Sequence, residues 1–257
     1  MLEQVVIIGG CYYVPLIQSL SIVIPAFNEE SRLPASLERI SRYLGGQSFS
    51  FVEILVVDDG SVDRTAEAAQ RFADRHSFVR VLRNPGNRGK GYSVRYGMDE
   101  ARGEWRLFTD ADLSSPIEEL EKLAAAVENE SNDIAIGSRA LNRALIEVHQ
   151  PAFREIAGKL FNFAMRTTIG LHIHDTQCGF KLFSRRAAET IFPRQRLERF
   201  GFDAEVLYIA YLHGFRIAEI PVRWRHVEGT KVSMWNGAQS FLDLLVIRAN
   251  QLSGRYK

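Results

Sequence analysis

The amino-acid sequence predicts an α/β protein with a largely parallel central sheet, helices on both faces and an amphipathic C-terminal helix. Two observations lead to this prediction. Short runs rich in β-branched residues alternate with segments of helical periodicity, the pattern of parallel sheets with helical crossovers. The chain has 257 residues, 46% of them hydrophobic, so it can bury a sizeable core. Because no linker composition or internal repeat divides it, we expect one domain over residues 1–235 and a tail over residues 236–257.

In the first half of the chain, predicted strands and helices alternate regularly. β-branched runs that end at turn residues predict strands at Ser21–Pro25, Val52–Val57, Val79–Leu82, Trp105–Thr109 and Asp133–Gly137. Helical spacing of apolar residues predicts helices at Pro34–Tyr43, Asp63–Arg75 and Tyr92–Ala101, and a further helix that begins at Pro116. This alternation is Rossmann-like, and in such sheets ligands bind where the strands end.

The second half is less regular. It predicts helices at Phe153–Ile169 and Ala204–Leu212, a segment of unassigned type at Thr176–Phe183 and a strand-like run at Phe215–Trp224.

The tail predicts one more helix, over Asn236–Leu252. Its apolar side chains gather on one arc, which contains Ala238, Phe241, Leu242, Leu245, Val246, Ala249 and Leu252. The opposite side is mixed, with Gln239, Asp243 and Asn250 interrupted by Leu244 and Ile247. Two interpretations stay open. The helix packs on the domain, as most such stripes do, or it lies in a lipid interface with Arg248, Arg255 and Lys257 near anionic lipid.

The composition excludes several classes of function. With 32 basic and 31 acidic residues the net charge is +1, so no overall field attracts nucleic acid, and no nucleic-acid-binding module is recognisable. Cys11 and Cys178 cannot form a disulfide framework, which favours a reducing compartment. The apolar run Val5–Ile17 is too short to span a bilayer, and no other segment reaches about 20 continuous apolar residues. We therefore expect peripheral contact with a membrane, on its cytoplasmic side.

Two aspartates directly follow the predicted strand Trp105–Thr109. Asp110 and Asp112 are two residues apart where the strand leaves the sheet. Mg²⁺ and Mn²⁺ take oxygen ligands and leave positions open for substrate phosphates. The pair therefore indicates a metal site for phosphate chemistry.

Polar clusters follow two other strands of the same sheet, at residues 28–30 and at Asp58-Asp59. Because parallel strands end at one edge, we expect these clusters to converge with Asp110 and Asp112. Taken singly, Glu29 and Glu30 could be a charge pair at a helix start, and Asp59 could cap the next helix.

A glycine-rich loop, Asn84–Gly91, brings Arg88 and Lys90 to a helix start, where backbone N–H groups can approach an anion. Its residue order is not that of a P-loop or a dinucleotide fingerprint, and a solvated turn is the alternative. Further cations that could meet an anionic substrate are Arg139, Lys181, Arg223, Arg225 and Lys231. Asp203 lies at a helix start, where capping alone could explain it. His172, His174, His213 and His226 lack the spacing of metal ligands and are interpreted as structural.

Seven short runs together resemble the family 2 glycosyltransferases of the GT-A fold, over about residues 20–235. They are residues 24–30, 57–61, 87–91, 110–114, 175–181, 202–205 and 227–233. Within that family the chain resembles the dolichyl-phosphate β-glucosyltransferases and related polyprenyl-phosphate sugar synthases. The run Asp-Thr-Gln-Cys-Gly-Phe-Lys at residues 175–181 points to the glucosyl branch.

The resemblance implies a role for each matching residue. The nucleoside would be held by Pro25, Phe27, Glu29 and Asp58. The ribose and a metal-bridged diphosphate would be held by Asp110 and Asp112, with Lys231 and Arg225 beside the diphosphate. The lipid phosphate would face Arg139 and Lys181. We add Lys90 of the glycine-rich loop to the nucleotide-sugar site. Many relatives carry a transmembrane anchor that we do not find in this sequence, so we expect attachment from the membrane surface.

The expected reaction is the inverting transfer of a hexose, with glucose favoured, from a nucleotide diphosphate sugar such as UDP-glucose to dolichyl or undecaprenyl phosphate. The metal at Asp112 and the ammonium of Lys231 would stabilise the departing diphosphate. An acceptor phosphate is mostly a dianion at neutral pH and needs no strong base, whereas a hydroxyl acceptor would need one, for which Asp203 is the candidate.

Alternatives stay open at this point. The donor could be GDP-mannose, or the acceptor a sugar hydroxyl. A phosphatase of the haloacid dehalogenase type also uses two aspartates with this spacing, but there the pair normally follows the first core strand rather than the fourth. A non-catalytic membrane-binding module is a third alternative, which the intact cation and carboxylate clusters disfavour.

Overall fold

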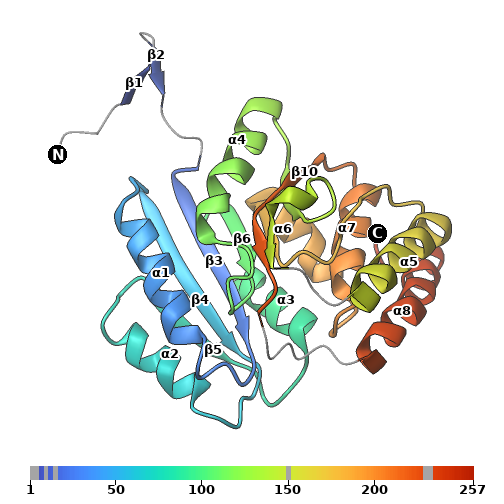
Figure 1. The fold of residues 1–257 in the computed structure, drawn as a ribbon, viewed down its shortest axis with the longest axis horizontal. Helices are drawn as coiled ribbons and strands as arrows, with labels where there is room; N and C mark the ends of the chain where they lie inside the picture. Colours follow the sequence, from blue (N-terminus) through green and yellow to red (C-terminus); the bar gives the residue numbers. More distant parts are fainter. Residues whose placement is uncertain (1–5, 9–10, 14–16, 149–151, 228–233) are drawn as a thin grey trace.

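A computed structural model describes residues 6–8, 11–13, 17–148, 152–227 and 234–257 (Figure 1). Lys231 and the rest of the run 228–233 therefore lie outside the described residues, as does part of the opening apolar run. Within the described ranges the chain forms the predicted α/β architecture, with a mostly parallel sheet between layers of helices (Figure 1).

The central sheet has seven strands in the order β10-β7-β9-β6-β3-β4-β5. These are β3 (Ser19–Ala26), β4 (Phe51–Asp58), β5 (Val79–Arg83), β6 (Trp105–Thr109), β7 (Ile134–Ser138), β9 (Phe180–Ser184) and β10 (Ile217–Pro221). All neighbours are parallel except β9, which runs antiparallel to both β6 and β7. Two small pairs lie outside this sheet: β1 (Val6–Ile8) with β2 (Cys11–Tyr13), and β8 (Ile146–Val148) with β11 (Trp224–Arg225).

One face of the sheet is covered by α1 (Leu33–Gly45), α2 (Thr65–Ala73) and α4 (Leu120–Glu130). Helix α1 shows why: its buried apolar residues Leu33, Leu37, Ile40 and Leu44 recur every three or four positions and pack in one cluster with side chains of β3 and β4. Proline at its second position suits the first helical turn.

The other face is covered by α3 (Lys90–Glu100), α6 (Arg185–Ile191) and α7 (Phe202–Leu212). Helices α5 (Ala152–Ile169) and α8 (Met234–Leu252) lie side by side on this part of the molecule, drawn in yellow and red in Figure 1. Both contribute to the core cluster that also contains Phe108 and the buried residues of α7.

Several predicted boundaries need correction. The segment at Thr176–Phe183 becomes a strand only from Phe180, and α6 was not predicted; Ser184 caps it by accepting a hydrogen bond from the N–H of Ala187. The run Phe215–Trp224 divides into β10 and β11. The helix expected at Pro116 starts instead with a 3-10 turn, Ile117–Glu119, before α4.

The C-terminal helix corrects the expectation in a different way. It packs on the domain, but through the side that interrupts its polar face, since Leu244, Ile247 and Asn250 are the buried residues among those of the helix whose burial the structure describes. Most of the apolar arc points outward. Among the described residues, none of the helices has the length and apolar character needed to cross a membrane.

Candidate active site

The loops that follow β3 and β4 are bound to each other at the carboxyl edge of the sheet. The N–H of Asn28 donates to Oγ of Ser61 (3.0 Å), the N–H of Val62 donates to Oδ1 of Asn28 (2.9 Å), and the N–H of Glu29 donates to Oγ1 of Thr65 (2.6 Å). Asn28 adopts a left-handed conformation (φ 54°), which asparagine tolerates better than most residues. The structure therefore brings the clusters at residues 28–30 and 58–59 together.

Asp58 is fully buried at this edge. Its Oδ1 accepts a hydrogen bond from the N–H of Ser61 (3.2 Å). Its Oδ2 has no hydrogen-bond partner among the residues that the structure describes, although it lies 3.5 Å from Nε of Arg83. A buried carboxylate oxygen without a donor is costly and uncommon. The site is thus suited to a ligand that donates a hydrogen bond.

The other residues expected at the nucleoside differ in accessibility. Pro25 is the second-last residue of β3 and Phe27 directly follows the strand, and both are partly exposed. The carboxylate of Glu29 is nearly buried and binds Arg32 through two bonds of 2.6 Å, so its charge is already compensated.

Asp59 orders the glycine-rich loop and does not cap α2. Its carboxylate accepts hydrogen bonds from the N–H groups of Arg88 and Gly89 (2.8 Å each) and from Nδ2 of Asn84 (2.7 Å). Gly89 has φ 107°, and a Cβ there would lie 2.5 Å from the carbonyl oxygen of Glu198. These contacts therefore hold the loop in one conformation and place the start of α3 at the site. The alternative of a solvated turn is not supported.

Lys90, the first residue of α3, reaches Asp110. Its Nζ lies 2.6 Å from Oδ1 of Asp110 and 5.1 Å from the ring centre of Phe108. Burial works to lower the pKa of Lys90, but the carboxylates of Asp110, Asp203 and Asp112 outweigh it, so the pKa is raised. Lys90 is therefore a permanent cation within the carboxylate cluster.

Gly179 explains part of the run at residues 175–181. Its carbonyl oxygen accepts a hydrogen bond from the N–H of Asp110 (3.2 Å), and a Cβ at this position would lie 2.0 Å from Oδ2 of Asp110. Only glycine leaves room for the carboxylate, so the run shapes the space in which Asp110 lies.

Asp112 begins a tight turn that also places Arg225. Its Oδ1 accepts a hydrogen bond from the N–H of Ser114 (2.9 Å), and the carbonyl oxygen of Ser114 accepts one from the N–H of Arg225 (3.0 Å). The side chain of Arg225 is exposed and forms no ion pair with any residue that the structure describes. A cation therefore lies free beside the turn of Asp112.

The contacts of Asp110 and Asp112 bear on the expected metal site. Oδ2 of Asp112 has no partner in the described ranges, and Asp110 shares its carboxylate with Lys90. No group of three or more potential metal-binding side chains occurs among the described residues. Two carboxylates suit Mg²⁺ or Mn²⁺, because these ions keep several positions for water and substrate phosphate. The residues fit the expected ion on this chemistry.

Arg139, which follows β7, is held in place by Asp175. Its Nε and Nη2 each lie 2.7 Å from the Asp175 carboxylate, and its N–H donates to the same carboxylate (2.9 Å). The guanidinium lies 5.2 Å from the ring centre of Trp224. Burial works to raise the pKa of Asp175, but Arg139 outweighs this and lowers it. Asp175 and Trp224 had no role assigned from the sequence, and the signal for Asp175 was its place at the start of the run 175–181.

Lys181 and Asp203 form a buried ion pair behind these residues. Lys181 is fully buried on β9, forms a short ion pair with Asp203 and donates to the carbonyl oxygen of Cys178 (2.6 Å). Burial raises the pKa of Asp203, and the neighbouring ammonium groups of Lys181 and Lys90 act against the rise. Asp203 does not cap α7 with its side chain. Lys181 is thus placed to act on Asp203 rather than directly on a ligand.

Three of the four histidines named in the sequence analysis have structural contacts, and Nδ1 of His172 lies 2.9 Å from the carbonyl oxygen of Gly170. His174 binds Glu219 (2.9 Å), and Nε2 of His213 lies 2.7 Å from the carbonyl oxygen of Tyr256.

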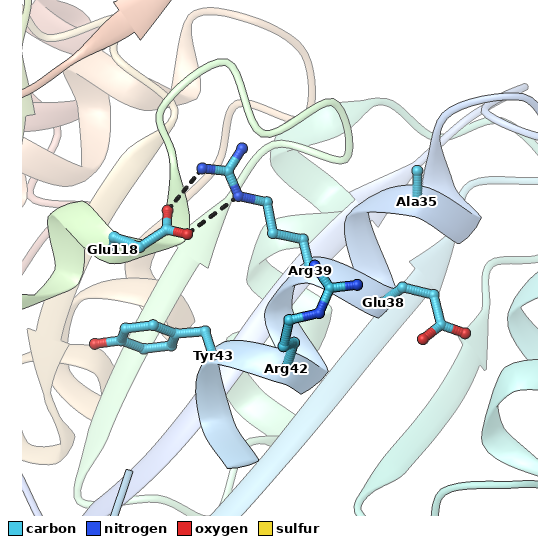
Figure 2. A pocket seen from close by; sticks show the side chains of 6 residues that line it. All are labelled: Ala35, Glu38, Arg39, Arg42, Tyr43 and Glu118. Carbon is cyan, nitrogen blue, oxygen red and sulfur yellow. Dashed lines mark hydrogen bonds and ion pairs between the residues drawn. The ribbon is translucent and has the colours of Figure 1, made fainter. Parts of the chain in front are cut away.

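A separate hollow lies on the outer side of α1 (Figure 2). It is lined by Ala35, Glu38, Arg39, Arg42, Tyr43 and Glu118. Arg39 donates to both carboxylate oxygens of Glu118, at 3.2 and 2.9 Å. Burial, with Glu121 and Glu118 nearby, raises the pKa of Tyr43 to about 12. None of the residues at the carboxyl edge lines this hollow, so it is not part of the candidate site.

Comparison with known proteins agrees with this geometry. A protein-family model described as "Glycosyl transferase family 2" matches residues 21–192. The dolichyl-phosphate β-glucosyltransferase of Homo sapiens is 38% identical over 253 residues, covering 93% of this chain and 78% of the human protein. The enzyme of the same name from Saccharomyces cerevisiae is 34% identical, covering 93% and 76% of the two chains.

Solved structures with this fold include sugar transferases. Glucosyl-3-phosphoglycerate synthase from Mycobacterium tuberculosis, in complex with Mn²⁺ and UDP-glucose, superposes with a TM-score of 0.67 at 18% identity, covering 90% of this chain and 79% of the other. Mannosyl-3-phosphoglycerate synthase from Rubrobacter xylanophilus gives a TM-score of 0.67 at 18% identity, covering 93% and 76%. At this identity the likeness establishes the shared fold alone.

Proposed function

The chain belongs to glycosyl transferase family 2, and from this premise we propose that it transfers glucose from UDP-glucose to a dolichyl-type polyprenyl phosphate, with inversion at the anomeric carbon. The observation that carries the proposal is the 34–38% identity to dolichyl-phosphate β-glucosyltransferases, because it extends over about nine-tenths of the chain and so includes every part of the candidate site.

The donor nucleoside is assigned to the edge formed by β3 and β4. Oδ2 of Asp58 lacks a hydrogen-bond donor, and a base or ribose could supply one. Phe27 and Pro25 beside it offer partly exposed apolar surface for the base. Glu29 stays a proposed contact, although a nucleoside would share its carboxylate with Arg32.

The diphosphate is assigned to the turn after β6. Asp110 and Asp112 would hold a Mg²⁺ or Mn²⁺ ion, which when bound supplies positive charge against the diphosphate. Lys90 adds a cation beside Asp110 and Arg225 adds one beside the turn of Asp112, and we keep Lys231 in this group from the sequence alone. Charge that develops on departing UDP is stabilised by groups already in place, which is a large term in such reactions.

The acceptor phosphate is assigned to Arg139. Asp175 accepts one N–H each from its Nε and Nη2, so the two N–H groups of Nη1 and the second N–H of Nη2 are left to meet a phosphate oxygen. In the reaction an oxygen of the acceptor phosphate forms a bond to the anomeric carbon of glucose while the bond from that carbon to UDP breaks. A phosphate dianion has no proton to lose, so the step needs no base.

The state of Asp203 disfavours a hydroxyl acceptor. Such an acceptor needs a general base within reach, and Asp203, the candidate, is buried and ion-paired with Lys181. Lys181 stays a proposed member of the acceptor site, acting through Asp203. We also propose that the protein works peripherally on the cytoplasmic side of a membrane, because its acceptor is a membrane lipid.

A donor and acceptor screen tests this function. Purified protein is supplied with radiolabelled UDP-glucose or GDP-mannose, together with dolichyl phosphate or a free sugar, with Mg²⁺, Mn²⁺ or EDTA. We expect label to enter the lipid fraction from UDP-glucose, and only with a divalent ion. Transfer from GDP-mannose alone, or to the free sugar alone, would overturn the proposed donor or acceptor.

A further inference from the structure

We propose that the outer faces of α5 and α8 together dock the protein on an anionic lipid bilayer. This surface, called the α5–α8 face here, consists of Leu160 and Phe163 on α5 and of Leu242, Leu245, Val246 and Leu252 on α8. The inference rests on the proposed function, since a lipid acceptor requires the enzyme to work at a membrane, and it assigns the surface that meets the membrane.

Helix α8 has one side buried in the domain and an opposite side with exposed apolar residues. The side with Leu244 and Ile247 is buried in the core cluster. The opposite side keeps its four large apolar residues 42–74% exposed. Leu245 and Val246 lie three and four positions after Leu242, and Leu252 lies seven after Leu245, which places them on one side of the helix. Apart from Phe241 at its edge, the apolar arc of this helix is therefore not what holds it on the domain.

Helix α5 extends the exposed apolar side of α8. Phe161 and Met165 bury the inner side of α5 in the same core cluster that receives α8, and the ring of Phe161 meets that of Phe241 edge-on at 5.5 Å. On the outer side, Leu160 and Phe163 are 57% and 66% exposed. Two neighbouring helices that bury one side in a shared core present their other sides outward (Figure 1). Large apolar side chains exposed on two neighbouring helices indicate an interaction site.

The charged residues around the α5–α8 face indicate which kind of partner it binds. Arg166 on α5 and Arg248 on α8 are exposed, and Arg255 and Lys257 follow α8 directly. Asp243, the one acidic residue in the sequence of α8, lies against Gly201 of the domain. Apolar side chains flanked by cations suit a bilayer with anionic head groups better than they suit an acidic or a neutral protein surface.

Hydrogen bonds near the C-terminus hold α8, and with it the α5–α8 face, against α7. The hydroxyl of Tyr256 donates to Oε1 of buried Glu205 (2.6 Å), and the hydroxyl of Tyr208 donates to Oε1 of Gln251 (2.7 Å). The face is therefore presented by a rigid part of the molecule. Deleting α8 would expose Leu244 and Ile247 and break these contacts, so the test uses surface substitutions.

The test variant is Leu242→Gln/Leu245→Gln/Leu252→Gln, which leaves the buried side of α8 unchanged. The matched control is Phe51→Gln, an exposed apolar residue at the first position of β4, at the opposite end of that strand from Asp58. Flotation with phosphatidylcholine vesicles containing phosphatidylserine is measured for each protein, and thermal unfolding checks folding. Because a buried leucine contributes about 1.5–3 kcal/mol of transfer free energy, we expect at least about a tenfold loss of vesicle affinity in the variant and none in the control.

Activity separates this inference from the proposed function. The variant should lose transfer to long-chain dolichyl phosphate in vesicles and keep transfer to a short, water-soluble polyprenyl phosphate. Unchanged flotation of the variant, or no flotation of the original chain, would overturn the docking face. Self-association of the original chain that the substitutions abolish, without flotation, would also overturn it and identify a protein interface. Flotation without transfer to either acceptor would leave the docking face standing and refute the proposed function.

Discussion

At the scale of single residues, Asp112 is the carboxylate whose removal should affect activity most and stability least. Its side chain is partly exposed and accepts one backbone hydrogen bond, from Ser114, which an asparagine oxygen can also accept. We predict that Asp112→Asn keeps the fold, loses Mn²⁺ binding by calorimetry and lowers the transfer rate by roughly three decades, as expected when an ion that stabilises a leaving diphosphate is lost. Full activity of this variant in EDTA would contradict the metal assignment.

Asp175 and Asp58 should separate the two substrates. Asp175→Asn weakens the contacts that hold Arg139, so we predict that the KM for acceptor rises about tenfold or more, at about 1.5–3 kcal/mol for a charged hydrogen bond, while the KM for UDP-glucose changes little. Asp58→Asn is the matched control and should weaken UDP binding without affecting the acceptor. Steady-state kinetics with each substrate varied in turn measures both. Parallel losses for both substrates in both variants would indicate that the two residues are structural.

These residues also show how far sequence predicts a site. Asp110 and Asp112 stood out because charged residues after strands meet at one sheet edge. Lys90 stood out in a glycine-rich loop at a helix start, and Arg139 as a cation that could meet an anionic substrate. The pairing of charged residues with each other could not be predicted. Asp175 lies 36 positions from Arg139, and Asp203 lies 22 positions from Lys181, so only the folded sheet brings each pair together. The individual catalytic and binding roles stay predictions.

At the scale of elements, the pair of β9 and α7 depends on one buried ion pair. Replacing one member leaves the other without its partner, so we predict that Lys181→Met costs about 3–5 kcal/mol of unfolding free energy. The double variant Lys181→Met/Asp203→Leu should recover most of that loss, because two apolar groups need no partner. Urea denaturation of the single and double variants measures this. A double variant as unstable as the sum of the single changes would refute the coupling.

The pH dependence of the Lys181→Met variant has a defined sign. Burial raises the pKa of Asp203 in the folded state above its ordinary value of 3.8, so folding favours its protonated form. Without Lys181, the stability deficit should therefore be small near that ordinary value and grow as the pH rises above it. A deficit that instead grows on acidification would show that Asp203 is held in its ionised form.

The elements show equally clear limits of sequence reasoning. Periodicity predicted the parallel strands and most helices, but not that β9 inserts antiparallel between β6 and β7, because strand order leaves no mark on periodicity. It located the apolar arc of α8 but not the side that packs. A core and a bilayer are both apolar, so the same arc suits either, and Leu244 with Ile247 forms the core contact.

At the scale of the whole molecule, the distribution of charge is more informative than its sum. The net charge is +1, which provides little long-range attraction to any surface. The carboxylates Asp58, Asp110 and Asp112 lie at the carboxyl edge of the sheet, whereas exposed arginines flank the α5–α8 face. A membrane-bound orientation would therefore be set by a local cluster of cations together with exposed apolar side chains.

The separate contributions of cations and apolar side chains predict how vesicle binding responds to salt. The Debye length falls from about 10 Å at 0.1 M to about 3 Å at 1 M, so salt should weaken the attraction of Arg166 and Arg248 to phosphatidylserine and leave apolar contacts intact. We expect affinity for phosphatidylserine vesicles to fall toward that for phosphatidylcholine vesicles as salt rises. Arg166→Gln/Arg248→Gln should lower the low-salt affinity by roughly tenfold or more, at about 1 kcal/mol for each cation, and flatten the salt dependence. The apolar variant of α8 should instead keep a salt dependence of normal slope at a reduced affinity. If both variants lost the salt dependence equally, binding would be electrostatic throughout, and the exposed leucines of α8 would need another partner.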